Sequence, residues 1–254
     1  MASLICDDNV EPSAIVAFTF TERAAAQLKE RIMDRVAEHR GRPFLDRLTP
    51  MFVGTIHGYC FHMLQRYVPK YGKYDVLDDH RHVGLLSREF FDLGLAKFRR
   101  PGQSPTQRWI RTVDVIGNEL IPEDRLSGIL GETYRKYRSM LERYHCLTFS
   151  LIIQCAVEAL DDPAIFERVH GPLRYLVVDE YQDINPAQER LIERLASSPV
   201  GLCVVGDDDQ CIYQWRGSDV TAIQALKDRR AKVHDEKLRV PGTGSGSDQD
   251  KILI

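Results

Sequence analysis

The chain has 254 residues, of which 43% are hydrophobic and 28% charged, so it can bury one sizeable core or two modest ones. It contains no apolar run long enough to span a membrane, and its first residues lack the basic start and apolar stretch of a secretory signal. We therefore expect a folded, soluble, cytoplasmic protein without a membrane segment.

The net charge of −3 conceals a gradient along the chain. Residues 1–60 carry a net charge of −1, residues 61–160 a net charge of +3, and residues 161–254 a net charge of −5. A basic middle and an acidic end suit a polyanion contact beside a metal site, although a mixed solvated surface explains the same gradient. The six cysteines are scattered without a CxxC pair, so neither disulfides nor zinc are predicted.

The first part of the chain alternates between strand and helix patterns. The run 14–20 (AIVAFTF) is apolar and rich in β-forming residues, which predicts a buried strand. Residues 22–39 place apolar side chains at helical spacing, with Thr21 as the N-cap and Gly41 beyond the end. A second strand is expected at 51–56, leading into another helix.

The middle of the chain, about residues 71–160, has a helical pattern broken by prolines and contains no convincing strand. Two further apolar runs, 173–179 and 201–207, then predict strands on either side of a helix at about 186–195. Strands that alternate with helices favour a mostly parallel sheet in an α/β layer. After Val240, the string PGTGSGSDQD has the composition of a flexible linker.

The string LVVDEYQDINPAQ (176–188) carries the strongest chemical signal. An apolar strand delivers Asp179 and Glu180 to its carboxyl end, where α/β sheets bind their ligands. Asp179 can hold Mg²⁺ and Glu180 can take a proton from an attacking water, provided that a nucleotide lies nearby. Taken alone, an acidic pair after a strand is also a common turn.

A second string, LCVVGDDDQCIYQWRGSD (202–219), is another strand followed by acids, an amide, aromatic rings and an arginine. Gln210 could contact a terminal phosphate, and Arg216 could pair with an acid or a phosphate. Tyr213 and Trp215 offer flat faces for unstacked bases, although either ring could equally belong to a core.

Four strings together resemble the UvrD, Rep and PcrA type of superfamily 1 DNA helicase. DEYQD is similar to the family's motif II, and GDDDQCIYQWRGS is similar to motif III, with Cys211 where serine is usual. AFTFTERAAAQLKERI (17–32) resembles motif Ia, and VGTIHGYCFHML (53–64) resembles motif Ib. All four occur in the family's order.

The resemblance implies a RecA-like P-loop NTPase fold, with an incomplete parallel sheet and an inserted all-helical subdomain. It implies ATP and Mg²⁺ as cofactors, with Asp179 on the metal, Glu180 as the base, and Gln210 and Arg216 linking phosphate to DNA. The residues that it assigns to single-stranded DNA are Thr19, Phe20, Thr21, Arg23, Thr55, His57, Tyr213 and Trp215. Without the motif, His57 would be interpreted as a core or capping group.

The same resemblance divides the chain into four parts. Residues 1–64 and 166–235 are expected to form motor core 1A, and residues 65–165 a helical insertion like subdomain 1B. The basic, tyrosine-rich character of this insertion fits a DNA-facing surface, and a solvated helical bundle is the alternative. Residues 236–254 are expected to be a linker-like tail.

The sequence also departs from the family. No GxGKT loop precedes the motif Ia string, and GTGSGSDQDK near the C-terminus does not replace it, because no strand precedes it. Only Leu238 and Arg239 faintly resemble motif IV, and no second motor domain follows. We therefore expect the isolated chain not to translocate. Loss of the loop's strand predicts exposed sheet edges, with marginal stability or self-association.

Three hypotheses about function follow. In the first, the chain is part of an ATP-dependent helicase or translocase that moves 3′ to 5′ on single-stranded DNA or at single/double-strand junctions, as in DNA repair, together with the missing remainder. In the second, it is a non-catalytic truncated remnant or half of a split protein that retains DNA binding. In the third, the complete protein also carries a nuclease. The first requires the strands near residues 179 and 207 to lie side by side.

Overall fold

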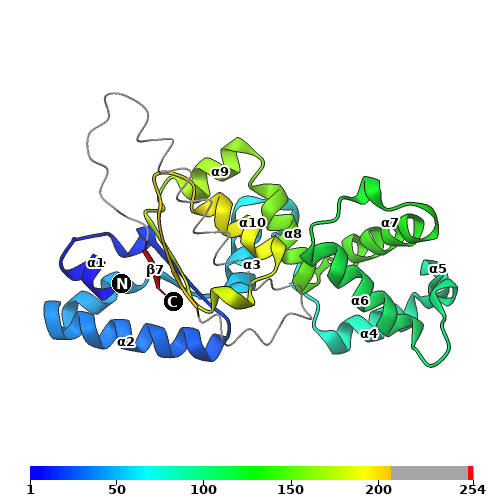
Figure 1. Ribbon diagram of the computed structural model, residues 1–254, viewed down its shortest axis with the longest axis horizontal. Helices are drawn as coiled ribbons and strands as arrows, with labels where there is room; N and C mark the ends of the chain where they lie inside the picture. Colours follow the sequence, from blue (N-terminus) through cyan, green and yellow to red (C-terminus); the bar gives the residue numbers. More distant parts are fainter. Residues whose placement is uncertain (207–250, 254) are drawn as a thin grey trace. The chain divides into compact units, whose positions relative to one another are not determined.

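A computed structural model describes residues 1–206 and 251–253, and it separates into two compact units (Figure 1). We call the first the sheet unit, which comprises residues 1–59, 167–185 and the described part of 192–254. We call the second the helical unit, which comprises residues 60–166 and 186–191. Among the described residues, no helix is both long and apolar enough to cross a membrane.

The sheet unit is built on one five-stranded sheet in the order β2-β1-β5-β6-β7, and every neighbouring pair is parallel. The strands are β1 (Ile15–Thr19), β2 (Phe52–Thr55), β5 (Tyr175–Val178), β6 (Gly201–Val205) and β7 (Lys251–Leu253). The predicted α/β class with a parallel sheet is therefore confirmed. The prediction that the strands before residues 179 and 207 are neighbours is also confirmed, because Val178 of β5 is in register with Val204 of β6.

Helices of two kinds connect these strands and form the helical unit. The α-helices are α1 (Ala2–Cys6), α2 (Glu22–Arg40), α3 (Ile56–Tyr67), α4 (Asp79–Arg88), α5 (Phe90–Leu93), α6 (Pro105–Asn118), α7 (Gly128–Arg143), α8 (Phe149–Ala159), α9 (Pro163–His170) and α10 (Pro186–Leu195). The 3₁₀ helices are η1 (Pro12–Ala14), η2 (Arg42–Leu48), η3 (Pro69–Tyr71), η4 (Leu95–Phe98), η5 (Glu123–Arg125) and η6 (Tyr181–Asp183).

The core of the sheet unit explains why β1 reads as a continuous apolar run. Every residue of β1 is buried, as expected for a strand that is covered on both faces. The helix α2 has Thr21 as its N-cap, whose hydroxyl accepts the Ala24 N–H at 3.1 Å, and Gly41 as its C-cap, whose φ is 81°. Ile15 of β1 and Ile32 of α2 belong to one buried cluster.

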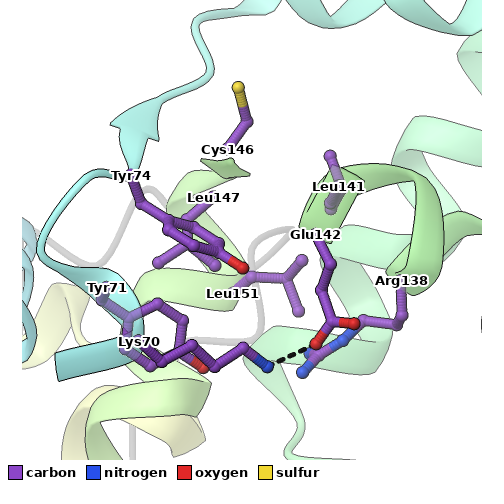
Figure 2. Close-up of a pocket in the computed structure, with 9 residues that line it drawn as sticks. All are labelled: Lys70, Tyr71, Tyr74, Arg138, Leu141, Glu142, Cys146, Leu147 and Leu151. Atoms are coloured by element: carbon purple, nitrogen blue, oxygen red, sulfur yellow. Dashed lines mark hydrogen bonds and ion pairs between the residues drawn. The ribbon is translucent and has the colours of Figure 1, made fainter. Parts of the chain in front are cut away.

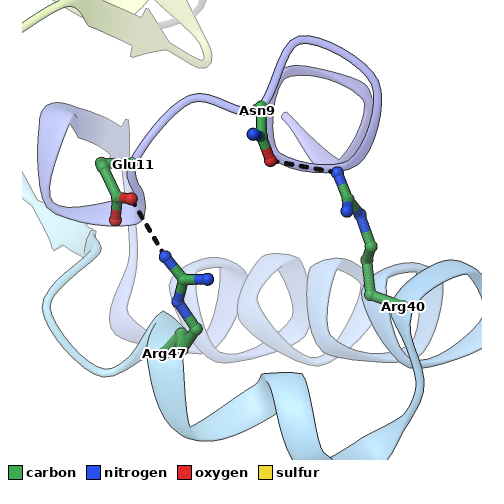
Figure 3. A network of polar contacts seen from close by, with 4 residues as sticks. All are labelled: Asn9, Glu11, Arg40 and Arg47. Atoms are coloured by element: carbon green, nitrogen blue, oxygen red, sulfur yellow. Dashed lines mark hydrogen bonds and ion pairs between the residues drawn. The ribbon is translucent and has the colours of Figure 1, made fainter.

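The N-terminal segment is held against α2 and η2 by two arginines (Figure 3). Arg40 donates to the side-chain oxygen of Asn9 at 3.2 Å, and Arg47 donates to Glu11 at 3.0 Å. Both guanidinium groups also lie over the Phe44 ring, with Cζ 5.8 and 4.9 Å from its centroid. These contacts are exposed, so each contributes little to stability, and their combined role is to fix the path of the segment.

Beyond β6 the sheet continues into the C-terminal segment. Cys203, Val204 and Val205 of β6 are in register with Lys251, Ile252 and Leu253 of β7. The edge that we expected to be unpaired therefore has a parallel partner, formed by three residues of the tail with linker-like composition. An open row of strand N–H and C=O groups favours the addition of such a strand.

The helical unit has an aromatic core. Trp109, Tyr134 and Tyr137 are almost completely buried, and the Trp109 and Tyr137 rings meet edge to face at 5.7 Å between centroids. Two of the tyrosines that we interpreted as part of a DNA-facing surface thus belong to the interior. The unit also contains a two-stranded parallel pair that the helical pattern did not predict, β3 (Asp75–Val76) with β4 (Cys146–Leu147).

Candidate functional site

The parallel sheet brings four of the predicted site residues to one edge. Thr19 ends β1 and is in register with Thr55, which ends β2. Asp179 follows β5, and its N–H donates to the carbonyl of Phe18 in β1 at 3.0 Å, so Asp179 and Glu180 leave the sheet beside Thr19. This edge holds the carboxyl ends of the strands, where α/β sheets place their ligands.

Asp179 is a half-buried carboxylate beside a second acid. One oxygen, Oδ1, accepts the backbone N–H of Glu180 at 3.1 Å. Burial raises the pKa of Asp179 above its ordinary value, the negative charge of Glu180 raises it further, and the Glu180 N–H partly opposes this shift. A bound cation stabilises the ionised form of a carboxylate that is partly removed from water and repelled by a neighbouring acid more than it stabilises a fully solvated carboxylate.

Magnesium fits such a site without further protein ligands. Among the described residues, no group of three or more His, Cys, Asp or Glu side chains comes together to hold a metal. Mg²⁺ in nucleotide sites is commonly bound by one or two carboxylates, several waters and the phosphates of the substrate. Asp179 can supply that single carboxylate.

Glu180 has an unusual backbone conformation. Its φ is 53° and its ψ is 45°, the left-handed region that disfavours residues with a side chain. The side chain of Gln182 donates to Glu180 Oε2 at 2.6 Å, and Gln182 itself is only 2% exposed. The turn of η6 therefore presents an exposed carboxylate that a buried amide holds in place.

Gln182 was not among the predicted site residues. Its letter lies within the DEYQD string, two positions after Glu180, and the turn brings the two side chains together. A spacing of two would place these side chains on different sides of an α-helix, so only the turn geometry reveals the contact.

The predicted motif Ia residues differ in what they can offer a ligand. Thr19 is buried and donates its hydroxyl to the Thr21 carbonyl at 3.0 Å, while the Thr21 hydroxyl caps α2. Phe20 is 38% exposed, and Arg23 is exposed in the first turn of α2. The two threonines therefore shape the turn between β1 and α2, and Phe20 and Arg23 are the accessible groups.

The predicted motif Ib residues continue this edge of the sheet. Thr55 donates its hydroxyl to Glu22 at 2.7 Å and accepts the Gly58 N–H at 3.2 Å, which ties the end of β2 to the start of α2. His57 is half-buried at the start of α3. Glu22 is a second partner that sequence reasoning missed, because it lies far from Thr55 in the chain.

Three aromatic rings support the same edge from within. Phe18, Phe52 and Tyr59 pack edge to face, with centroids 6.4, 5.2 and 5.0 Å apart. Such pairs stabilise a core beyond their buried area. They join β1, β2 and the first turn of α3, and so fix the strand ends that carry Thr19 and Thr55.

The remaining predicted residues belong to the motif III string. Gln210, Tyr213, Trp215 and Arg216 lie outside the described residues. The strand that leads to them, β6, is placed beside β5 and ends at Val205.

The helical unit contains a pocket lined by basic and aromatic side chains (Figure 2). Lys70 forms an ion pair with Glu142 across it, and Arg138 lies beside the same carboxylate. The hydrogen bond that Glu142 accepts from Lys70 lowers the pKa of Glu142, and this effect outweighs the opposing effect of partial burial. Because Glu142 already lies between the two cations, an incoming anion would have to displace a carboxylate here.

Comparisons with known proteins agree on the class of this chain. A family model described as UvrD/REP helicase N-terminal domain matches residues 1–231. The "ATP-dependent DNA helicase PcrA" of Bacillus subtilis is 30% identical over 241 residues, and that of Staphylococcus aureus (strain Mu50) is 31% identical over 243 residues. Each match covers 89% of this chain and 31% of the relative, so the chain spans about a third of the length of these proteins.

Proposed function

The chain belongs to the UvrD/REP helicase N-terminal domain family, and we propose that it supplies the front part of an ATP-dependent DNA helicase or translocase. One observation carries the proposal: β1, β2 and β5 end at the same edge of the sheet and gather Thr19, Thr55, Asp179 and Glu180 there. This edge is the one at which related folds bind nucleotides.

In this proposal the two carboxylates have separate tasks. Asp179 would hold Mg²⁺, which supplies neutralisation of the phosphate charge when it is bound together with ATP. Glu180 would accept a proton from the water that attacks the terminal phosphate. The Gln182 amide is bonded to Oε2 of Glu180, and this contact orients the carboxylate so that Oε1 can face the water.

A single DNA strand would be bound at the neighbouring turn. Phe20 offers a ring on which a base can stack, and Arg23 offers a charge for a backbone phosphate. The α2 N-terminus adds backbone N–H groups that favour an anion. Movement from 3′ to 5′, preference for junctions and a role in repair belong to the same proposal, as do phosphate and DNA contacts by Gln210, Arg216, Tyr213 and Trp215.

A second candidate function is DNA binding without hydrolysis. The observation that favours it is the exposure of Phe20 and Arg23 at the turn before α2, because these two groups can bind a DNA strand without a nucleotide. In that case the chain would act as a DNA-binding module.

An ATPase assay stimulated by single-stranded DNA separates the two candidates. The helicase proposal expects turnover that depends on Mg²⁺ and falls by at least about 100-fold in Glu180→Gln, because the proton acceptor is lost. The matched control is Glu38→Gln, which neutralises an exposed glutamate of α2 whose partner is Arg35. Turnover that is equally low in all three proteins, together with DNA binding, would support the module.

Binding of DNA itself is tested in the same proteins by fluorescence anisotropy with a labelled oligothymidylate. Phe20→Ala and Arg23→Ala should each weaken binding by roughly 10-fold, as loss of one stacked base or one phosphate contact would. Wild-type protein that does not bind the oligonucleotide at low salt would contradict both candidate functions.

A further inference from the structure

Two arginines of the helical unit share one tyrosine ring. The Cζ atoms of Arg88 and Arg143 lie 5.5 and 5.3 Å from the centroid of the Tyr144 ring. Arg88 ends α4, Arg143 ends α7, and Tyr144 is the C-cap of α7. Guanidinium groups are favoured at both positions, because the C-terminal end of a helix carries partial negative charge and an aromatic face attracts cations.

The buried carboxylate of Glu89 holds Arg143 and Tyr144 in place. Glu89 accepts Arg143 Nη2 at 2.7 Å and the Tyr144 hydroxyl at 2.6 Å. The hydrogen bond from Tyr144 is the main cause that lowers the pKa of Glu89, and Arg143 and Arg88 lower it further. The side chain of Glu89 is 10% exposed and that of Arg143 is 62% exposed. The anion therefore faces inward, and the two cations are held at the surface before any ligand arrives.

An exposed aromatic ring lies next to these cations in the chain. Phe91 is 87% exposed, the largest value among the big hydrophobic side chains of the described residues. It follows Glu89 by two residues, so the two backbones are at most about 7 Å apart. Its ring makes an edge contact with Phe90 at 5.4 Å and is otherwise open. Leaving a phenylalanine so exposed costs solvation free energy, which a ligand that covers it would recover.

We propose that Arg88, Arg143 and Phe91 form a nucleic-acid contact of the helical unit, in which the guanidinium groups bind backbone phosphates and Phe91 stacks on an unpaired base. The inference rests on the proposed function, since it takes DNA as the substrate. Fixed arginines provide the fork that matches phosphate oxygens, and a neighbouring ring provides a stacking platform.

The pocket of Figure 2 is the weaker alternative within the same unit. There the Lys70 ammonium is already paired with the half-exposed Glu142 carboxylate. Arg88, by contrast, forms no ion pair among the described residues, and the acid beside it is nearly buried and already bonded to Arg143 and Tyr144. A phosphate can therefore approach Arg88 without displacing a carboxylate.

An acidic peptide would also be attracted by two arginines, but it would make no use of the exposed ring. Stacking on a base uses both the ring and the charges, so the observations favour a nucleic acid. Competition by oligoglutamate separates these ligands. If the site binds nucleic acid, oligoglutamate should displace the oligothymidylate only when the concentration of its carboxylates is far above the concentration of oligothymidylate phosphates.

The test is anisotropy of a labelled oligothymidylate with the full chain and charge-reversed variants. Arg88→Glu should weaken binding roughly 10-fold at low salt, because a phosphate contact is lost. The difference in affinity between this variant and the wild type should become smaller as the salt concentration rises. Arg111→Glu, which reverses another exposed arginine of the helical unit, in α6, is the matched control and should change binding far less. Arg88→Glu leaves both bonds to Glu89 in place, so the circular dichroism spectrum should match the wild type, while loss of the favourable contacts with the α4 end and the Tyr144 ring should lower the melting temperature only slightly.

The ring is tested separately. Phe91→Ala should weaken binding several-fold without changing the salt dependence, and Ile129→Ala, at another exposed apolar position of the unit, should have no effect. Equal weakening by Arg88→Glu and Arg111→Glu would overturn the inference, as would displacement by oligoglutamate at concentrations matched to phosphate. If Arg23→Ala weakens binding and Arg88→Glu does not, the proposed function stands and this inference fails.

Discussion

The strand ends of the sheet unit and the interior of the helical unit use their residues differently. At the strand ends, Glu180 has a left-handed backbone and Asp179 is a half-buried acid beside a second acid. In the helical unit, Trp109 and Tyr137 pack tightly in the core. Unfavourable local conformations that persist commonly mark functional positions, because the surrounding structure supports them. Substitutions in the packed core should therefore destabilise the helical unit, and substitutions that relieve these unfavourable features should stabilise the strand ends.

The largest expected effect is in the packing of the helical unit. A Cβ atom added at Gly131 of α7 would lie 2.2 Å from the Leu126 carbonyl oxygen and 2.8 Å from its carbon. Because both atoms belong to the backbone, we expect Gly131→Ala to lower the free energy of unfolding by about 3 kcal/mol. Urea unfolding followed by circular dichroism measures this loss.

Gly84 of α4 is the matched control for that substitution. A Cβ added there meets no atom within 4 Å, so Gly84→Ala should stabilise the unit by up to about 1 kcal/mol, as alanine does in helices. If both substitutions changed the free energy of unfolding in the same direction, backbone packing around Gly131 would not be as close as described.

The next effect concerns a buried histidine of the same unit. Burial lowers the pKa of His82 from 6.5 to about 4, against a small opposing effect of Asp79, and its Nε2 is 2.9 Å from the Tyr137 hydroxyl. The unfolded chain takes up a proton below pH 6.5, whereas the folded protein does so only near pH 4. The contribution of His82 to the free energy of unfolding is therefore fully present above pH 6.5. About 3 kcal/mol of it is lost as the pH falls from 6.5 toward 4.

Two variants isolate this contribution from the titration of carboxylates. His82→Gln keeps a polar partner for Tyr137 and should remove most of the extra loss of stability between pH 6.5 and 4. His80→Gln changes an exposed histidine of the same helix and should leave the pH dependence as it is in the wild type. Thermal melting across this range gives the comparison, and parallel curves for wild type and His82→Gln would rule out a buried neutral histidine.

A smaller effect of opposite sign is expected at Glu180. Because φ is 53° at residue 180, the free energy of unfolding of Glu180→Gly should be about 1 kcal/mol higher than that of Glu180→Ala. At exposed Arg35 within α2 the order should be reversed, with alanine favoured over glycine by about the same amount. Denaturant midpoints of the four variants test this directly. Alanine favoured at both positions would mean that residue 180 is not left-handed in solution.

The elements that could be predicted from the sequence are those with local signals. The helix predicted at 186–195 matches α10 at both ends, and β1 lies within the predicted run 14–20. Both patterns depend on apolar residues spaced within one segment. The α2 N-cap was also predicted, because Thr21 bonds to a backbone N–H only three residues away.

The features that could not be predicted depend on distant partners. The strand β7 forms from a tail of linker-like composition because the edge of β6 is available to it. Tyr134 and Tyr137 belong to a string that looks basic and solvated, and only the packing of α7 shows that these two rings face inward. At the candidate site, the contact of Glu22 with Thr55 joins residues 33 positions apart.

The smallest expected effect tests whether the strand ends sacrifice stability for binding. Burial and the charge of Glu180 both raise the pKa of Asp179, so at neutral pH the folded protein holds a charge that water would solvate better. Asp179→Asn removes this charge and keeps an oxygen for the Glu180 N–H, which should raise the melting temperature slightly at pH 7. Asp34→Asn, an exposed position of α2, should not change the melting temperature. A lower melting temperature for Asp179→Asn would mean that Asp179 stabilises the fold, and its raised pKa would then offer no reason to assign it to a cation.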